Sequence, residues 1–482
     1  MNTVTTRFAP SPTGFMHVGS LRTALYAWLY ARKHNGRFIL RIEDTDKERE
    51  VEGAIPHIIE SLTWLGLTWD EGVDIGGPHA PYLQSDRLPL YRSYAERLLA
   101  SGHAYPDPYS EAELEELRAK AAEEKRPFLF RDHRPTTIDA WDGKTPLRFR
   151  APRIARYEWN DLARGHLSAG EEAIDDFILI KSDGYPTYNL AHIVDDIEMG
   201  VTHVMRGEEF ISSTPKFLAL YEALGATPPA FVTMPVILGP DGKKKLSKRD
   251  GAKDILDYRA EGYVPEAMIN FLALLGWNPG TEQEFFSPEE LIQAFDLSHI
   301  QVSGAGFDEV KLRSVNQHWM RLLSTDEFLA QLGGDTAKLD QKKLALAVPL
   351  LKDRAHTFAE AREMLTGELS CLFARPALDR EKLAQKELPD RPGIALEALK
   401  TLSEAIKSLP EAVSPEEVKE AVMPLADGEE AKGKGGRGAV LWPLRYALSG
   451  QERSPDPFTF IAILGPEESI SRIQKAIAIL AH

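Results

Sequence analysis

Two segments far apart in the chain carry residues that could hold phosphate groups. The first, RFAPSPTGFMHVGS (residues 7–20), contains His17 and two glycines, Gly14 and Gly19. The second, KLSKR (residues 245–249), places two lysines around one serine. Glycine lets the backbone approach an anion closely, and lysine supplies a positive charge. Together the two segments predict binding of a nucleoside triphosphate and a reaction that uses it for activation.

The first segment is expected at the carboxyl edge of a parallel sheet. VTTRFA (4–9) is rich in β-branched and aromatic residues, PSPTG is typical of a turn, and LRTALYAWLYARKHNG (21–36) has helical apolar spacing. RFILRI (37–42) then begins a second strand, which gives the βαβ order of such a sheet. The N-terminus of the helix between them offers unpaired N–H groups and a partial positive charge, which suits ATP. His17 would add a hydrogen bond or a charge there.

Neither segment is decisive by itself. The turn has no G-x-x-x-x-G-K-[ST] and no G-x-G-x-x-G, so a P-loop and a dinucleotide fingerprint are both missing there. H-x-G-S also fits a turn that is only structural, and a lysine-rich turn such as KLSKR is a common surface feature. The choice between these interpretations depends on the longer pattern.

The longer pattern resembles the glutamyl-tRNA synthetases of class I. PSPTGFMHVGS followed by RIEDTD resembles the first signature of that family, in which HVGS stands for the HIGH motif, and KLSKR resembles KMSKS. GYPTYNLAHIVDD (184–196), THVMRGEEFISSTP (202–215) and LGPDGKKKLSKRDGA (238–252) follow in the same order as in the family. The resemblance is strong over residues 1–320 and more diffuse to the C-terminus.

The resemblance implies an α/β fold, with a class I Rossmann-like nucleotide-binding domain, an inserted acceptor-binding domain and an all-helical C-terminal anticodon-binding region. A chain of 482 residues is too long for one ordinary core. Helical apolar spacing is clear over 85–100, 266–275, 338–369 and 394–422, and AKGKGGRG (431–438) is typical of a hinge before LWPLRYALSG. The expected boundaries are 1–83 and 184–235 for the two halves of the catalytic domain, 84–183 for the insertion that binds the acceptor end, 236–323 for a helical stem-contact domain with the KLSKR loop, and 324–482 for the anticodon-binding region.

Composition points to a cytoplasmic protein. No apolar run approaches the ~20 residues that cross a bilayer, and the first nine residues lack the layout of a secretion signal, so no membrane partner is expected. The single cysteine, Cys371, excludes an internal disulfide, and a monomer is the default. The net charge of −16 argues against a generally basic surface. A tRNA would therefore be held along local basic clusters such as the lysines near KLSKR.

Amino-acid activation requires a carboxylate in line with the α-phosphate of ATP while pyrophosphate leaves, and it needs no covalent protein nucleophile. His17 and the helix N-terminus are expected to hold phosphate oxygens. Lys245 and Lys248 are expected to close on the pyrophosphate, and Ser247 would cap their loop. These four residues are the predicted catalytic group, and ATP is expected together with Mg²⁺. The predicted ATP contacts are Ser11, Gly14, His17, Gly19, Ser20, Lys245 and Lys248.

L-Glutamate, the substrate that the resemblance implies, has two carboxylates and an ammonium group, so its pocket needs cations and an acceptor. Arg7 and Arg206 are the candidate cations and Glu43 is the candidate acceptor, because all three are expected at one sheet edge. Tyr188 is expected to form a wall of the pocket. The family match adds Ala9, Ser11 and His192. Some relatives have Asn where this chain has the histidine, which leaves the substrate contact there open.

One family feature is missing from the sequence. Many relatives carry a cysteine cluster after the segment that corresponds to GHAY (102–105) and bind zinc there, whereas this chain reads PDPYSEAEL. Neither His103 nor His133 has partners at ligand spacing, so no structural zinc is expected. In the C-terminal region, Arg354 is a candidate anticodon contact.

The main interpretation is a glutamate-tRNA ligase that forms glutamyl-adenylate from glutamate and ATP and transfers the glutamyl group to the 3′-terminal adenosine of tRNA. The sequence leaves open a non-discriminating enzyme that also charges glutamine tRNA. A truncated relative that modifies a base of aspartate tRNA is disfavoured by the long helical C-terminal region. A small-molecule nucleotidyltransferase would need neither the insertion nor that region, and a catalytically silent tRNA-binding paralogue is disfavoured because the chemistry-bearing residues are intact.

Overall fold

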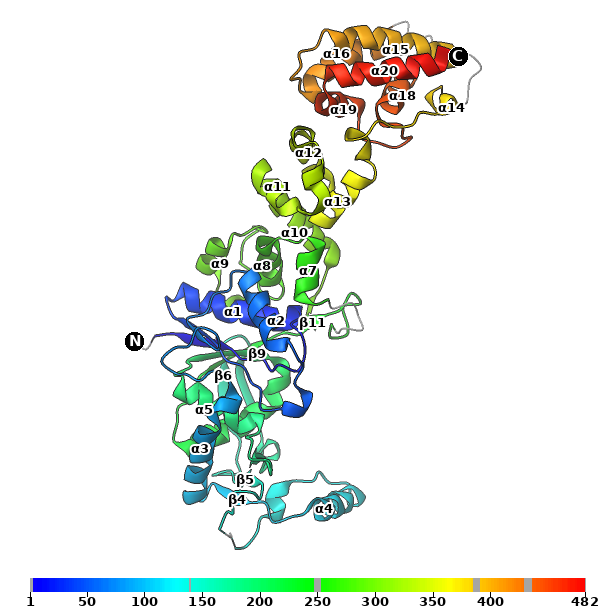
Figure 1. Ribbon diagram of the computed structural model, residues 1–482. Helices are drawn as coiled ribbons and strands as arrows, with labels where there is room; N and C mark the ends of the chain where they lie inside the picture. The colour runs from blue at the N-terminus through cyan, green and yellow to red at the C-terminus, as the bar shows by residue number, and fades with distance from the viewer. Residues whose placement is uncertain (1–2, 138–139, 247–252, 385–390, 429–435, 482) are drawn as a thin grey trace. The chain divides into compact units, whose positions relative to one another are not determined.

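The computed structural model describes residues 3–137, 140–246, 253–384, 391–428 and 436–481. The chain forms two compact units, the first made of Met1–Arg259 with Val264–Val315 and the second of Ala260–Tyr263 with Asn316–His482. Figure 1 follows the chain from blue at the N-terminus to red at the C-terminus. Within the described ranges, no helix is both long enough and apolar enough to cross a membrane.

A mostly parallel sheet forms the centre of the first unit. One part has the order β1 (Thr5–Phe8), β2 (Arg37–Leu40), β3 (Glu71–Gly72), all parallel. The other has the order β9 (His203–Gly207), β10 (Ala230–Met234), β6 (Tyr157–Asp161), β7 (Gly165–Ala169), and only β7 is antiparallel. The two parts meet where the Thr202 N–H donates to the Thr5 carbonyl at 2.9 Å. The predicted α/β class is confirmed.

Helix α1 (Val18–Lys33) joins β1 to β2 and packs on both, as the βαβ order predicts. Its apolar stripe is buried and comprises Leu21, Ala24, Leu25, Trp28 and Leu29. Burying each leucine stabilises this packing by about 1.5–3 kcal/mol. Position 36, between α1 and β2, requires glycine because a Cβ there would lie 2.2 Å from the Val4 carbonyl oxygen. The helix itself begins at Val18, at the carboxyl edge of β1.

Other helices surround the sheet (Figure 1). Helix α1 also contacts α8 (Pro265–Leu274) and α9 (Pro288–Ala294), and α2 (Ala54–Trp64) lies between β2 and β3 in sequence. A separate core gathers α3 (Leu88–Ala100), α5 (Tyr188–Glu198) and α6 (Thr214–Leu224). β11 (Ile237–Leu238) pairs with β12 (Ala305–Gly306), and α7 (Ile255–Glu261) and α10 (Glu309–Leu322) complete the helical part that follows the sheet.

The predicted insertion contains a small sheet and part of the large one. β4 (Ala104–Pro106), β5 (Leu147–Phe149) and β8 (Ile178–Ile180) form an antiparallel sheet, and α4 (Glu111–Glu123) begins at a Ser110 capping box. Asp176 accepts from Arg134 at 2.6 Å and from Tyr105 at 2.7 Å in this region. Residues 157–169 are expected in the insertion from the sequence. In the structure, β6 pairs with β10 of the large sheet. The alternating pattern YEWND fits a strand of either sheet.

In the second unit every described regular element is a helix, which confirms the predicted helical C-terminal region. The helices are α11 (Thr325–Leu332), α12 (Gln341–Arg354), α13 (Phe358–Thr366), α14 (Arg380–Leu383), α15 (Arg391–Lys407), α16 (Pro415–Asp427), α18 (Arg437–Ser449), α19 (Pro457–Leu464) and α20 (Pro466–Ala481). α15 packs on α18 and α20. The predicted hinge falls mostly outside the described residues, and its last two residues, Arg437 and Gly438, already belong to α18.

Candidate active site

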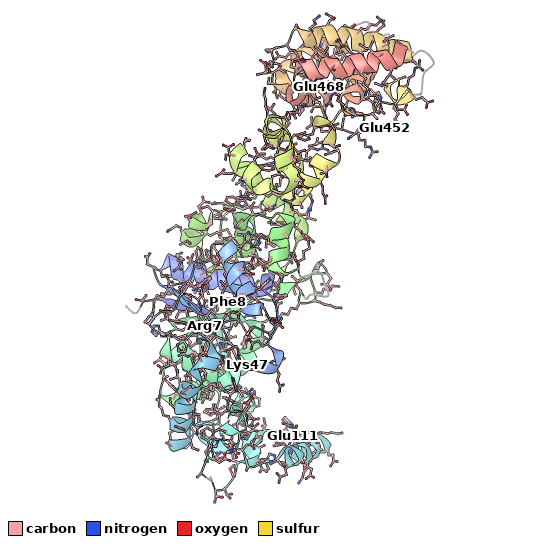
Figure 2. The ribbon with its side chains drawn as sticks, in the orientation of Figure 1. Arg7, Phe8, Lys47, Glu111, Glu452 and Glu468 are labelled. Carbon is pink, nitrogen blue, oxygen red and sulfur yellow. The ribbon has the colours of Figure 1, made fainter. Side chains whose placement is uncertain are left out.

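A cleft of about 1440 Å³ lies at the carboxyl ends of the strands. Its walls come from the segments after β1, β2, β9 and β10, and from the start of α5. Figure 2 labels Arg7 on β1 and Lys47 in the segment after β2, both of which line it. The predicted site residues that line the cleft are Arg7, Ala9, Ser11, His17, Gly19, Ser20, Glu43, Tyr188, Arg206 and Lys245.

Five predicted residues are not placed there. Gly14 and His192 are not among the lining residues. Arg354 ends α12 in the second unit, where it pairs with Glu368 at 3.0 Å. Ser247 and Lys248 lie outside the described residues, so their roles stay predictions.

Arg206 is a buried cation in the cleft wall. Its side chain donates to the Thr214 hydroxyl at 2.6 Å, and the guanidinium carbon lies 4.1 Å from the centre of the Phe231 ring. Its Nε has no hydrogen-bond partner, and none of the described acids forms an ion pair with it. Burial lowers the pKa of Arg206 to about 10, so it is charged at pH 7. An anionic ligand group would supply the partner that this cation lacks.

Arg7 and Glu43 are fixed by a second buried arginine, Arg41. The Arg41 guanidinium donates to Glu43 at 3.0 Å and to Asp196 at 2.8 Å, and Asp196 also accepts from Arg7 at 3.1 Å. Burial raises the pKa of Glu43, and the charges of Arg41 and Arg7 act against that rise. Burial would also raise the pKa of Asp196, but Arg7 and Arg41 hold it at about 2.

Tyr188 lines the cleft, and His192 lies behind it. The two rings stack with their centres 4.3 Å apart, and the His192 Nδ1–H donates to the Tyr188 carbonyl at 2.5 Å. His192 is not among the residues that line the cleft, because Tyr188, one helical turn earlier on α5, stacks on it, and its part in the pocket wall stays a prediction. His192 is only 4% exposed, and burial lowers the pKa of its ring to about 3.

The neutral His192 ring predicts a specific pH dependence of stability. An unfolded histidine takes up a proton below about pH 6.5, whereas the folded ring stays neutral until about pH 3. Between these values the unfolded state binds more protons, so the free energy of unfolding falls as pH falls, by up to about 1.4 kcal/mol per pH unit. In His192→Asn this contribution is absent. Urea unfolding at pH 7, 6, 5 and 4 is expected to show that the free energy of unfolding falls less toward acid pH in the variant than in the parent. A difference between the two proteins that stays constant with pH would contradict a neutral His192 in the folded state.

His17 caps helix α1 with its own side chain. Its Nδ1 accepts from the Gly19 N–H at 3.1 Å, and its Nε2 lies 3.4 Å from the Ser20 hydroxyl. In the neutral ring this arrangement puts the remaining proton on Nε2. The ring and the first turn of α1 together line the cleft.

The first segment contacts the chain where the described residues resume after 252. Asp254 forms an antiparallel bridge with His17 of that segment. The Ile255 N–H donates to the Met16 carbonyl at 3.2 Å, and the His57 Nε2 of α2 lies 2.6 Å from Asp254. His57 is not predictable from the sequence, because nothing in the local sequence connects it with either segment.

Lys245 lies at the end of a turn and faces the cleft with an exposed side chain. Leu238 and Lys245 form an antiparallel bridge, and the Leu246 N–H donates to the Ile237 carbonyl at 2.8 Å. Its Nζ lies 3.6 Å from the Glu209 carboxylate. An exposed pair at this distance contributes little to stability, so the ammonium group can exchange Glu209 for a phosphate at small cost.

Several residues in or next to the site were not predicted from the sequence. Lys181 lines the cleft and pairs with Asp183 at 2.9 Å, just before the segment GYPTYNLAHIVDD. Asp195 and Asp196 end that segment and were quoted only as part of it. Two consecutive acids in a largely apolar helix were the available signal. Among the described residues, no group of three or more His, Cys, Asp or Glu side chains could hold a metal ion.

Comparison with known proteins agrees with this geometry. Residues 3–314 match the model of the class I tRNA synthetases (E and Q), catalytic domain, and residues 315–477 match an anticodon binding domain. The chain is 41% identical to the glutamate-tRNA ligase of Dehalococcoides mccartyi over 100% of this chain and 98% of the relative. It is 43% identical to that of Clostridium botulinum over 99% and 98%.

Solved structures give the same result. The crystal structure of a glutamate tRNA ligase from Elizabethkingia meningosepticum in complex with its amino acid has a TM-score of 0.86 at 37% identity, covering 99% of each chain. Glutamate-tRNA synthetase from Elizabethkingia anophelis has a TM-score of 0.84 at 37% identity, covering 99% of this chain and 100% of that one. The match extends over both units, from the cleft to the helical region. The chain therefore belongs to the glutamate-tRNA ligases, a family of class I aminoacyl-tRNA synthetases.

Proposed function

We propose that the cleft binds L-glutamate and ATP side by side, forms glutamyl-adenylate and passes the glutamyl group to the 3′-terminal adenosine of tRNA. The observation that carries the proposal is Arg206, a buried guanidinium without an acid partner among the described residues. It lines the same cleft as Arg7 and Glu43. A side-chain carboxylate is the group that Arg206 would hold.

The charges of the pocket fit this substrate. Arg7 and Arg41 carry two positive charges, Glu43 and Asp196 carry two negative charges, and Arg206 adds one further positive charge. Glutamate at pH 7 has one net negative charge, so the occupied pocket would be neutral. In low dielectric surroundings such a balance favours glutamate over glutamine, which has no net charge.

Activation would follow from the position of the ATP phosphates. The N-terminus of α1 and His17 would hold phosphate oxygens, while Lys245, together with Lys248, would hold the pyrophosphate. A carboxylate oxygen of glutamate then bonds to the α-phosphorus, the bond to the β-phosphate oxygen breaks, and pyrophosphate leaves with its electron pair. Mg²⁺, carried by the nucleotide, would neutralise the charge on the leaving group.

In the second step, the tRNA would receive the glutamyl group. The small sheet and α4 would bind its acceptor end, and the second unit would bind its anticodon, with Arg354 as one candidate contact. The ribose hydroxyl of the terminal adenosine would attack the glutamyl carbonyl carbon and release AMP. We place the reaction in the cytoplasm and expect a monomer.

Aminoacylation with labelled glutamate on separately transcribed glutamate and glutamine tRNAs tests the function. Charging of the glutamate tRNA alone is expected, and unlabelled glutamine should not compete. Charging of both tRNAs would establish the non-discriminating alternative. Charging of neither would contradict the proposal and favour the silent paralogue or the small-molecule nucleotidyltransferase.

A further inference from the structure

Asp195 and Asp196 are consecutive buried acids of α5 that face two different sets of partners. Asp196 accepts from Arg7, which lines the cleft, at 3.1 Å and from Arg41 at 2.8 Å. Asp195 is 0% exposed and has a different set of side-chain donors. Three side chains outside the cleft lining donate to it: Gln84 at 2.8 Å, Arg87 at 2.7 Å and Tyr91 at 2.9 Å.

Arg41 connects the two acids. Its Nε lies 3.5 Å from an Asp195 oxygen, an ion pair without a hydrogen bond, while its other nitrogens donate to Asp196 and Glu43. The guanidinium is 0% exposed, so its position depends on these carboxylates and on the contact with Met199. In a buried cluster of this kind, moving one charged group leaves its partners unsatisfied, which resists any displacement.

The outer partners come from an element that precedes the small sheet. Gln84 and Arg87 form the 3₁₀ helix Gln84–Arg87, and Tyr91 lies in the first turn of α3, which runs to β4. Arg87 also donates to the carbonyls of His79 and Pro81 at 2.9 and 2.8 Å. This element has no cleft-lining residue of its own. It is joined to the pocket through the buried acids and through the backbone around Glu43, where the Ser85 N–H donates to Asp44 at 2.8 Å and the Gln84 N–H donates to the Ile42 carbonyl at 3.1 Å.

We propose that Gln84, Arg87 and Tyr91 are positioning residues for glutamate. Acting through Asp195, they hold Arg41, and Arg41 holds Glu43 directly and Arg7 by way of Asp196. The inference rests on the proposed glutamate site. Loosening this chain of contacts weakens the glutamate pocket and leaves the ATP subsite, built from α1 and the turn before Lys245, unaffected.

Helix α3 offers a matched pair of variants. Tyr91 and Tyr94 both donate a hydroxyl hydrogen to a carboxylate of α5, Tyr91 to Asp195 and Tyr94 to Glu198 at 2.5 Å. Only the Tyr91 bond belongs to the chain of contacts that reaches the pocket. Tyr91→Phe and Tyr94→Phe each remove one hydroxyl and keep the ring in its packing.

In aminoacylation assays, Tyr91→Phe is expected to raise KM for glutamate about fivefold to tenfold, with kcat and KM for ATP within about twofold of the parent. Tyr94→Phe is expected to leave all three parameters within about twofold. A KM for glutamate that is equal in the two variants would overturn the proposal. A parallel rise of both KM values in Tyr91→Phe would also overturn it, since a general loosening of the fold gives that result.

Gln84→Met provides the second measurement, because it removes an amide donor from a different element at nearly constant volume. It is expected to raise KM for glutamate alone, as Tyr91→Phe does, and a raised KM for ATP would count against the proposal. The parent enzyme separates this test from that of the proposed function. If the parent does not charge tRNA, the function fails; if it charges tRNA and the two tyrosine variants behave alike, only the positioning role fails.

Discussion

Replacing Arg206 with Met is expected to lower kcat/KM for glutamate by about 100- to 1000-fold while KM for ATP stays nearly unchanged. The Arg206 guanidinium is 6% exposed and would hold a carboxylate of the substrate in a buried, hydrogen-bonded pair. Removing one partner of such a pair costs about 2–5 kcal/mol, and each 1.4 kcal/mol corresponds to tenfold. Steady-state aminoacylation with each substrate varied in turn measures the effect.

Stability measurements distinguish this loss from damage to the fold. A buried cation without an acid partner destabilises the empty protein, so Arg206→Met is expected to melt at the same temperature as the parent or higher. Arg206→Lys keeps the charge but loses the planar fork, and about a tenfold loss is expected. An unchanged KM for glutamate in Arg206→Met, or a large fall in its melting temperature, would contradict the role.

Replacing Lys245 with Met is expected to lower kcat about 100-fold and to leave KM for glutamate within about twofold. The exposed ammonium group would stabilise charge on the leaving pyrophosphate, and loss of one such donor typically costs ~10²–10³ in kcat. Single-turnover formation of glutamyl-tRNA measures the step directly.

Lys243 is the matched control for this variant. It lies in the same turn, where its backbone N–H donates to Asp241 at 3.0 Å, and it is not among the residues that line the cleft. Lys243→Met is expected to behave like the parent. Equal rates for the two methionine variants would show that Lys245 contributes only to the general positive charge of the turn.

Local signals made much of the fold predictable. The apolar stripe of α1 and the β-branched run of β1 each specify their element within a few residues. The carboxyl-edge position of Arg7 and the segment that carries Arg206 also followed from strand order. The structure brings both into one cleft with Glu43 and Tyr188.

Long-range contacts made the rest unpredictable. β6 pairs with β10 although β7, β8, α5, β9 and α6 separate the two strands in sequence, and no local pattern indicates that partner. Arg41 directly follows β2 and has no distinguishing sequence signal, and only the fold shows that it holds both Glu43 and Asp196. The stacking of Tyr188 on His192 was not predictable either, because a sequence match gives the position of a side chain along a helix but not what covers it.

The junction between β1 and β9 affects how the chain is made. Thr5 and Thr202 are 197 residues apart and hydrogen-bond to each other in both directions. At about 5–20 residues per second, a ribosome needs roughly 10–40 s to add the second strand after the first. Throughout that interval the outer edge of β1 has no strand beside it, while α3, α4 and the small sheet emerge and can fold. The catalytic sheet is therefore completed late, and until then the edge of β1 offers unpaired backbone groups to other chains.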